Sequence, residues 1–128
     1  MIQRSYPGAE KSLDINAPKR QFSDALGRVA GDSELLAAMA MFVVEDSQEV
    51  IDELQTHLQC HEMTQAAASA HKLKGMLSTF ETAGPVIDLH ELIVAAKENN
   101  TEECARIWKR CRIEIESLVV EISSLRQT

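Results

Sequence analysis

Apolar residues along this chain recur at spacings of three and four, which is the pattern of helices that bury one side. The clearest run lies near the C-terminus, where the apolar positions are Ile107, Cys111, Ile115, Leu118, Ile122 and Leu125. No stretch of the sequence shows the strict alternation that indicates a half-buried strand. The pattern therefore predicts an all-α fold.

Glycines, prolines and capping residues divide this pattern into five expected helices. Their predicted bounds are about 22–30, 33–59, 63–80, 85–99 and 101–125. Asp32 or Ser33 is expected to cap the second helix and Thr101 the fifth, and Pro85 opens the fourth. Because short connections join long amphipathic helices, we expect an antiparallel up-down four-helix bundle with a short extra N-terminal helix.

The domain is predicted to cover residues 21–128, and residues 1–20, which contain Pro7, Gly8 and Pro18, are expected to form a mobile N-terminal arm or linker. Within the second helix, the positions expected to face the core are Leu35, Leu36, Met39, Phe42, Val43, Val50, Leu54 and Leu58. Asp46 interrupts this set, and the sequence alone gives no reason for it.

The overall charge restricts the class of partner. The chain has 128 residues, the size of one ordinary domain, and a formal net charge of −7. Nucleic acid and anionic membranes need a basic face, so neither is expected as the main partner. The sequence has no run of about 20 apolar residues and no secretory signal, so we expect a cytoplasmic, monomeric protein. Its three cysteines are expected to be reduced, with Cys104 and Cys111 in the core.

The third predicted helix carries the most informative pattern. At about 100° per residue, the apolar positions of this helix fall on one stripe: Ala66, Ala70, Leu73, Leu77 and Phe80. His71 points about a third of a turn away from that stripe, so we expect it to be exposed near the middle of the helix. Most of its neighbours on the helix surface are small: Thr64, Ala67, Ala68, Gly75 and Ser78.

Gly75 is unexpected at this place, because glycine inside a helix costs roughly 1 kcal/mol relative to alanine. A strip without bulk would allow another protein to bring its own active site against His71. Lys74, three residues after His71, could neutralise an anion attached to the imidazole, and Lys72 adds positive charge beside it. The simpler alternative is an exposed surface histidine in a stretch of good helix formers.

The segment "AHKLKG" at residues 70–75 resembles the H-x-L-K-G signature of histidine-containing phosphotransfer (HPt) domains, the phosphocarriers of bacterial phosphorelays. The resemblance extends from about residue 22 to 125. It implies that His71 is phosphorylated on a ring nitrogen, that Lys74 stabilises the phosphoryl group and that Gly75 clears space for the partner. Glu81, Thr82 and Ile93 depart from residues common in this family.

The same resemblance implies a carrier without independent catalytic machinery, which accepts a phosphoryl group from the aspartate of a receiver domain or from a sensor or hybrid histidine kinase and passes it to another receiver. Thr64, Ala67, Ala68, Lys72 and Ser78 are the predicted docking residues. The chain itself is expected to need no cofactor, since magnesium would be bound by the receiver.

Two other interpretations remain open from the sequence. The first is a helical interaction module that docks a receiver or kinase without being phosphorylated, for which loss of His71 would be harmless. The second, which the missing ligand set disfavours, is a metal-binding bundle enzyme based on His57, Cys60 and His61. No fourth ligand accompanies these three residues, so no metal site is predicted.

Overall fold

The computed structural model describes residues 22–127, and the N-terminal arm expected at residues 1–20 lies outside this range. The described residues form five α-helices and a final turn of 3-10 helix, with no strand among them. The elements are α2 (Ser23–Arg28), α3 (Ser33–Gln59), α4 (Met63–Leu77), α5 (Pro85–Lys97), α6 (Thr101–Ser123) and η1 (Ser124–Gln127). The prediction of an all-α protein is therefore confirmed.

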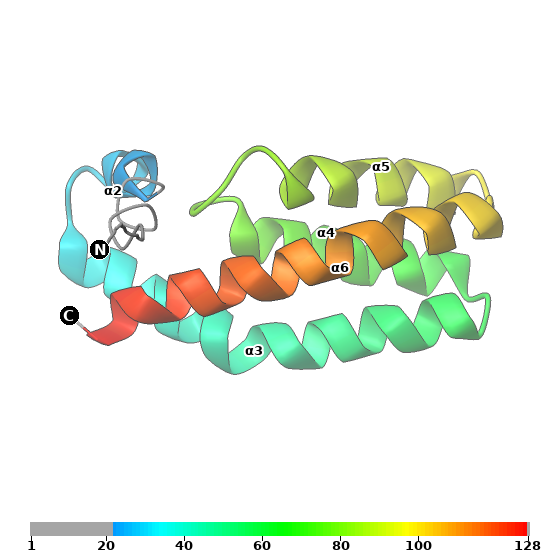
Figure 1. Ribbon diagram of the computed structural model, residues 1–128, viewed down its shortest axis with the longest axis horizontal. Coiled ribbons are helices and arrows are strands. Elements are labelled where there is room, and N and C mark those ends of the chain that lie inside the picture. Colours follow the sequence, from blue (N-terminus) through cyan, green and yellow to red (C-terminus); the bar gives the residue numbers. More distant parts are fainter. Residues whose placement is uncertain (1–21, 128) are drawn as a thin grey trace, which may run out of the picture.

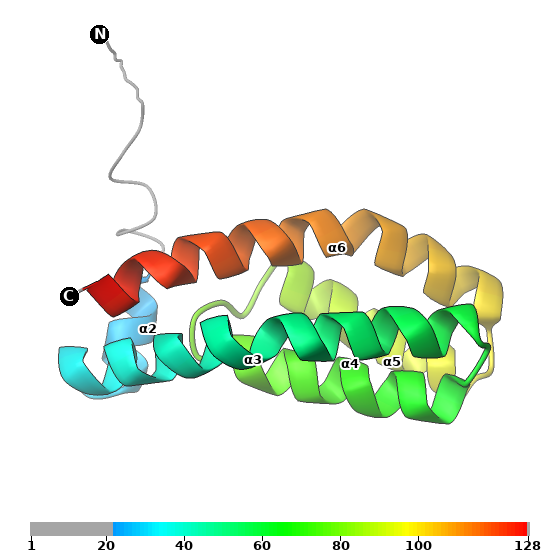
Figure 2. The same ribbon diagram turned by 90° about the horizontal axis from the view of Figure 1, so that it is seen from below.

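Helices α3 to α6 lie side by side along the long axis of the molecule, and successive helices run in opposite directions (Figure 1). The helix α4 packs against α3 and α5, and α6 packs against the same two helices from the other side. The short helix α2 lies at the end where α3 begins and α6 ends (Figure 2). Among the described residues, no helix is both long enough and apolar enough to cross a membrane.

The predicted apolar stripe of the third helix is buried in the structure. Its members Ala66, Ala70, Leu73, Leu77 and Phe80 are all at most 1% exposed. However, α4 ends at Leu77, and Phe80 lies in the turn that follows it instead of in the helix. There the Phe80 ring meets the ring of Phe22 edge to face, with 5.9 Å between the ring centres, and so helps to hold the start of α2 against the turn after α4.

The buried side of α3 differs from the predicted one. Leu35 is 46% exposed and Phe42 is 66% exposed, so placing these two residues in the core was wrong. The buried positions are spaced by three, four or one: Leu36, Ala40, Val43, Ser47, Val50, Ile51 and Leu54. This stripe passes through Ser47, and Asp46 is exposed beside it. The predicted set contained only larger apolar residues and so left out Ala40 and Ser47. With these two residues included, the buried stripe is continuous and Asp46 does not interrupt it.

The helix caps explain where α3 and α6 begin. Asp32, one of the two candidates named from the sequence, caps α3, since its carboxylate accepts a hydrogen bond from the Leu35 backbone N–H at 3.0 Å. For α6, the cap is Asn100 and not Thr101: the Asn100 side-chain oxygen accepts from the Glu103 N–H at 3.2 Å. Asn99 before it has a φ of 59°, a left-handed turn that ends α5 and sets Asn100 at the start of the next helix.

Cys104 and Cys111 lie in the core as free thiols, as expected. Cys104 and Cys111 are fully buried between the helices, and Cys60 is exposed. Burial is the main reason that the pKa of the Cys111 thiol rises to about 12 and that the pKa of Cys104 is also raised. Both buried thiols therefore stay protonated at neutral pH and serve as small apolar side chains.

The cap assignment can be tested by replacing Asn100 and Thr101 separately. Asn100→Ala should lower the free energy of unfolding by about 1 kcal/mol, because the Glu103 N–H loses its acceptor. Thr101→Ala is the matched control and should change it little, since Thr101 already lies inside the helix. Urea unfolding followed by the fluorescence of Trp108, the single tryptophan, measures both. A larger loss for Thr101→Ala than for Asn100→Ala would contradict the assignment.

Candidate functional site

His71 lies on the outward side of α4, near the middle of the helix, and its side chain is exposed. Leu73 and Leu77 of the same helix are fully buried. The exposure predicted for His71 is therefore confirmed, and it follows directly from the rotation of α4 that these two leucines impose.

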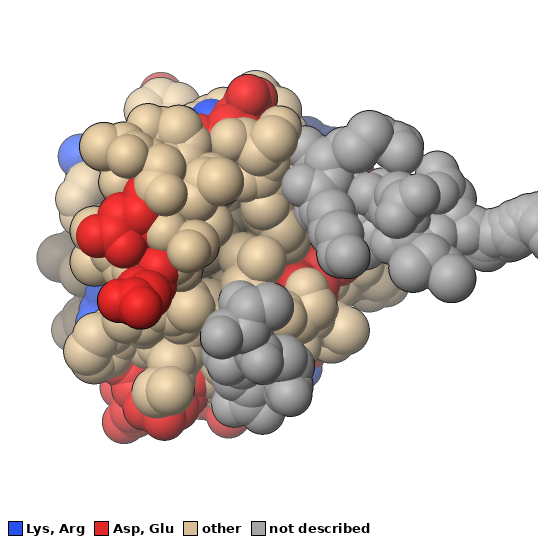
Figure 3. Space-filling view, turned by 90° about the vertical axis from the view of Figure 1, so that its left-hand side faces the viewer, with Lys and Arg blue, Asp and Glu red and all other residues tan. Residues whose placement is uncertain are grey.

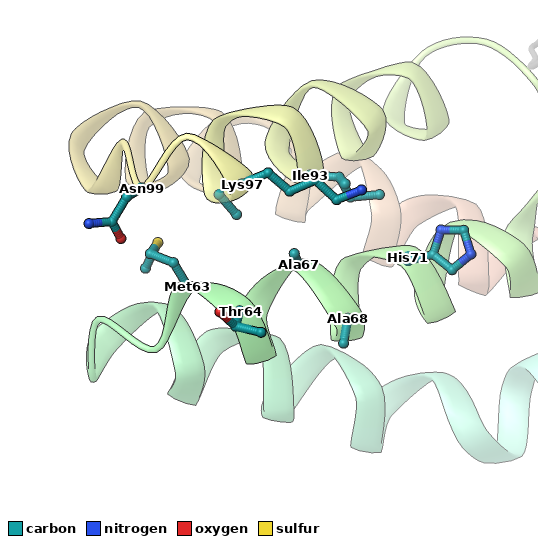
Figure 4. A pocket seen from close by; sticks show the side chains of 9 residues that line it. Met63, Thr64, Ala67, Ala68, His71, Ile93, Lys97 and Asn99 are labelled. Carbon is teal, nitrogen blue, oxygen red and sulfur yellow. The ribbon is translucent and has the colours of Figure 1, made fainter.

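An open groove of about 670 Å³ runs between α4 and α5 and ends at His71 (Figure 4). The residues that line it are Met63, Thr64, Ala67, Ala68, His71, Ile93, Ala96, Lys97 and Asn99. Three of the predicted docking residues thus belong to one surface. Thr64 and Ala68 are exposed on it, whereas Ala67 is only 8% exposed and forms part of its floor. The Ile93 and Lys97 side chains face these residues from α5 (Figure 4).

A second groove, of about 310 Å³, lies on the other side of α4, against α3. Lys72 and Gly75 line it together with the exposed ring of Phe42. A Cβ atom added to Gly75 would have no neighbouring atom within 4 Å outside its own helix, so the glycine is not required for helix packing. Its backbone is also ordinary helix. The open space supports the prediction that Gly75 keeps the surface low beside His71.

Lys74 lies on the α5 side of His71 and is half-buried between the two helices. Its Nζ atom is 3.5 Å from Nδ1 of His90, which comes from α5. His90 is exposed on α5, and nothing in the sequence pattern connects it with Lys74. The two residues are 16 positions apart, and only the antiparallel pairing of α4 with α5 brings them together.

Ser78, the last predicted docking residue, is half-buried just after α4. Its hydroxyl donates a hydrogen bond to the Gly75 carbonyl oxygen at 3.1 Å. This contact satisfies one of the carbonyl groups left open at the end of a helix. In the structure the Ser78 hydroxyl thus helps to terminate α4, and a docking role for this residue stays a prediction.

His57 and His61 lie near the C-terminal end of α3, and the His57 ring has a partner there. His57 Nδ1 lies 2.8 Å from the Glu62 carboxylate, and His61 has a φ of 57° in the turn between α3 and α4. Within the described range, no group of three or more side chains of the metal-binding types comes together.

The groove at His71 differs in charge from the acidic hollow beside α6, and it shares its lack of acidic lining residues with the hollow that Lys109 and Arg112 line. None of the nine residues that line the groove at His71 is acidic, and Lys97 is one of them. By contrast, a hollow beside α6 is lined by Glu81, Glu114 and Glu121, and the pKa of Glu121 is raised by burial and by the nearby charge of Glu81. Acidic groups also outnumber basic ones on the end of the molecule that carries α2 (Figure 3). An anionic ligand or partner surface would thus meet less repulsion at His71 than at these acidic surfaces.

A protein-family model described as "Hpt domain" matches residues 38–121, which is more than half of the chain. The chain therefore belongs to the Hpt family. Membership implies a histidine phosphotransfer role in a phosphorelay, as a phosphocarrier and not as an enzyme, and interaction with receiver domains and kinases. Comparisons with curated proteins and with solved structures gave no match.

The open space at Gly75 leads to a stability prediction. Gly75→Ala should raise the free energy of unfolding by up to about 1 kcal/mol, because alanine favours a helix and its Cβ meets no neighbour. Ala68→Gly, on the same exposed surface of α4, is the matched reverse change and should lower it by a similar amount. Urea unfolding measures both. A loss of stability in Gly75→Ala would mean that the glycine is needed for packing after all.

Proposed function

We propose that this protein is a phosphocarrier of a two-component phosphorelay, which accepts a phosphoryl group on His71 and passes it to the aspartate of a receiver domain. The donor would be the phosphorylated aspartate of another receiver or a histidine kinase. The observation that carries this proposal is the exposed His71 with Lys74 one turn further on, in a chain that belongs to the Hpt family. The helices α3 to α6 would then form the up-down four-helix bundle of a phosphotransfer domain, with α2 as an additional helix.

The chemistry suits an exposed imidazole. The unprotonated ring nitrogen of His71 attacks the phosphorus atom of an aspartyl phosphate, and the N–P bond forms as the P–O bond to the aspartate breaks. The electron pair of the broken bond stays on the aspartate carboxylate, and the other ring nitrogen keeps its proton or releases it to water. The return step reverses these changes on a second receiver. Such transfers depend mainly on in-line positioning and on neutralisation of charge.

Within this chain, Lys74 is the proposed source of positive charge for the phosphoryl group. It lies one turn from His71 on the side of α5, so its ammonium can reach an anion held on the imidazole. Lys72 adds a second charge on the α3 side. Magnesium and the aspartate would come from the receiver, and no cofactor of this chain is part of the proposal.

The proposed docking surface consists of the two grooves on either side of His71. Thr64, Ala67 and Ala68 would contact the receiver along the α5 side, and Lys72 and Gly75 along the α3 side. Small side chains support this role because they let a second protein approach the backbone of α4 closely. Phe42, which is 66% exposed beside the second groove, offers an apolar contact of the kind found in protein interfaces.

Phosphorylation of the full-length chain tests the proposal. Incubation with phosphoramidate, a small phosphodonor, or with a phosphorylated receiver should attach one phosphoryl group that is labile in acid and stable in base. His71→Gln should abolish this label without a change in the circular dichroism spectrum, because the exposed ring supports no part of the core. His57→Gln, at the far end of α3, is the control and should be labelled like the wild type.

Two results would oppose the proposal. A label that persists in His71→Gln would place the phosphoacceptor elsewhere. Complete absence of label in the wild type, combined with binding to a receiver that His71→Gln does not weaken, would favour an interaction module that is never phosphorylated.

A further inference from the structure

Lys74 and His90 contact each other across the two helices, with 3.5 Å between Nζ and Nδ1. An ammonium group can only donate hydrogen bonds, so a hydrogen bond in this contact requires the His90 tautomer that carries its proton on Nε2 and accepts at Nδ1. In the antiparallel pairing of α4 with α5, Ile93 lines the same groove as His71, and His90 lies one turn before Ile93, beside Lys74. His90 therefore belongs to the same face of the molecule as His71.

We propose that His90 is a positioning residue that orients the Lys74 ammonium for phosphoryl transfer at His71, an inference that rests on the proposed function. A lysine side chain is long and flexible, and ordering it during transfer opposes the reaction. The contact with His90 holds the ammonium on the α5 side of α4 before the phosphoryl group arrives. One of the three N–H groups of Lys74 points to His90, and two remain for phosphoryl oxygens.

A neutral acceptor suits this task better than a carboxylate. An acidic partner would neutralise the Lys74 charge and compete with the phosphoryl group for it, whereas a neutral imidazole leaves the charge available. The acidic residues of α5 nearest in sequence to His90 are directed elsewhere: Arg110 of α6 lies 3.0 Å from the Asp88 carboxylate and 3.8 Å from that of Glu91. Among the described residues, Lys74 forms no ion pair with a carboxylate.

A double-mutant cycle tests the inference, with the rate of His71 phosphorylation by phosphoramidate as the measurement. His90→Ala should lower this rate by about two- to fivefold, the range expected for an exposed contact of this type. His90→Asn should restore most of the rate, because its amide oxygen can accept from Lys74 near the place of Nδ1. In the Lys74→Ala background, His90→Ala should cause no further loss, because the residue it positions is already gone. His57→Ala is the control for removal of a histidine away from the site and should match the wild type.

The possible results separate this inference from the proposed function. If the wild type is labelled at His71 but His90→Ala has the wild-type rate, the positioning role of His90 is overturned and the carrier function stands. If His90→Ala lowers the rate equally with and without Lys74, His90 acts independently of Lys74 and the inference is also overturned. If His71 is not labelled in any variant, both fail. Thermal unfolding of each variant, followed by circular dichroism, identifies a change in rate that arises from loss of fold.

Discussion

The burial of one side of α4 between α3 and α5 determines the position of the site residues that α4 carries. Leu73 and Leu77 are fully buried, and Ala66 and Ala70 bring the backbone of α4 close to its neighbours. Burying each leucine stabilises the fold by roughly 1.5–3 kcal/mol, so α4 cannot rotate about its axis without a large loss of stability. This fixed rotation turns His71 outward, places Lys74 on the α5 side and sets Lys72 and Gly75 on the α3 side. The chemistry at His71 thus depends on contacts on the opposite side of the same helix.

The surface around His71 combines low relief with local positive charge in a chain whose net charge is −7. Small side chains lie along α4 on both sides of the histidine, and the groove toward α5 has no acidic lining residue. Acidic residues gather on other surfaces, such as the hollow formed by Glu81, Glu114 and Glu121, while in the groove toward α3 Asp46 stands opposite the charge of Lys72. A receiver domain with an acidic active site could therefore approach His71 more favourably than it could approach these other surfaces.

The sequence predicted the parts of this arrangement that depend on contacts within one helix. The buried stripe of α4, the exposure of His71 and the cap at Asp32 follow from helical periodicity and local hydrogen bonding, and all three are present. The core side of α3 could not be predicted fully, because Ala40 and Ser47 are buried by their neighbours and not by their own hydrophobicity. The cap at Asn100 was missed because Asn100 and Thr101 are adjacent residues that are both of capping type, and the prediction placed the start of the helix one residue too late. The contact of Lys74 with His90 depends on how two helices pair, which periodicity within either helix does not specify.

The central claim is that α4 presents His71 on a surface kept clear for another protein, and Gly75→Leu tests it most directly. The wild type and Gly75→Leu are each phosphorylated by two phosphodonors. One donor is a receiver that transfers phosphate to the wild type, and the other is phosphoramidate. A Cβ at position 75 meets no neighbouring atom and the position lines an open groove, so the fold should persist with leucine there. The account predicts that Gly75→Leu accepts phosphate from phosphoramidate at close to the wild-type rate but loses most of the transfer from the receiver. Transfer from the receiver at the wild-type rate would contradict it.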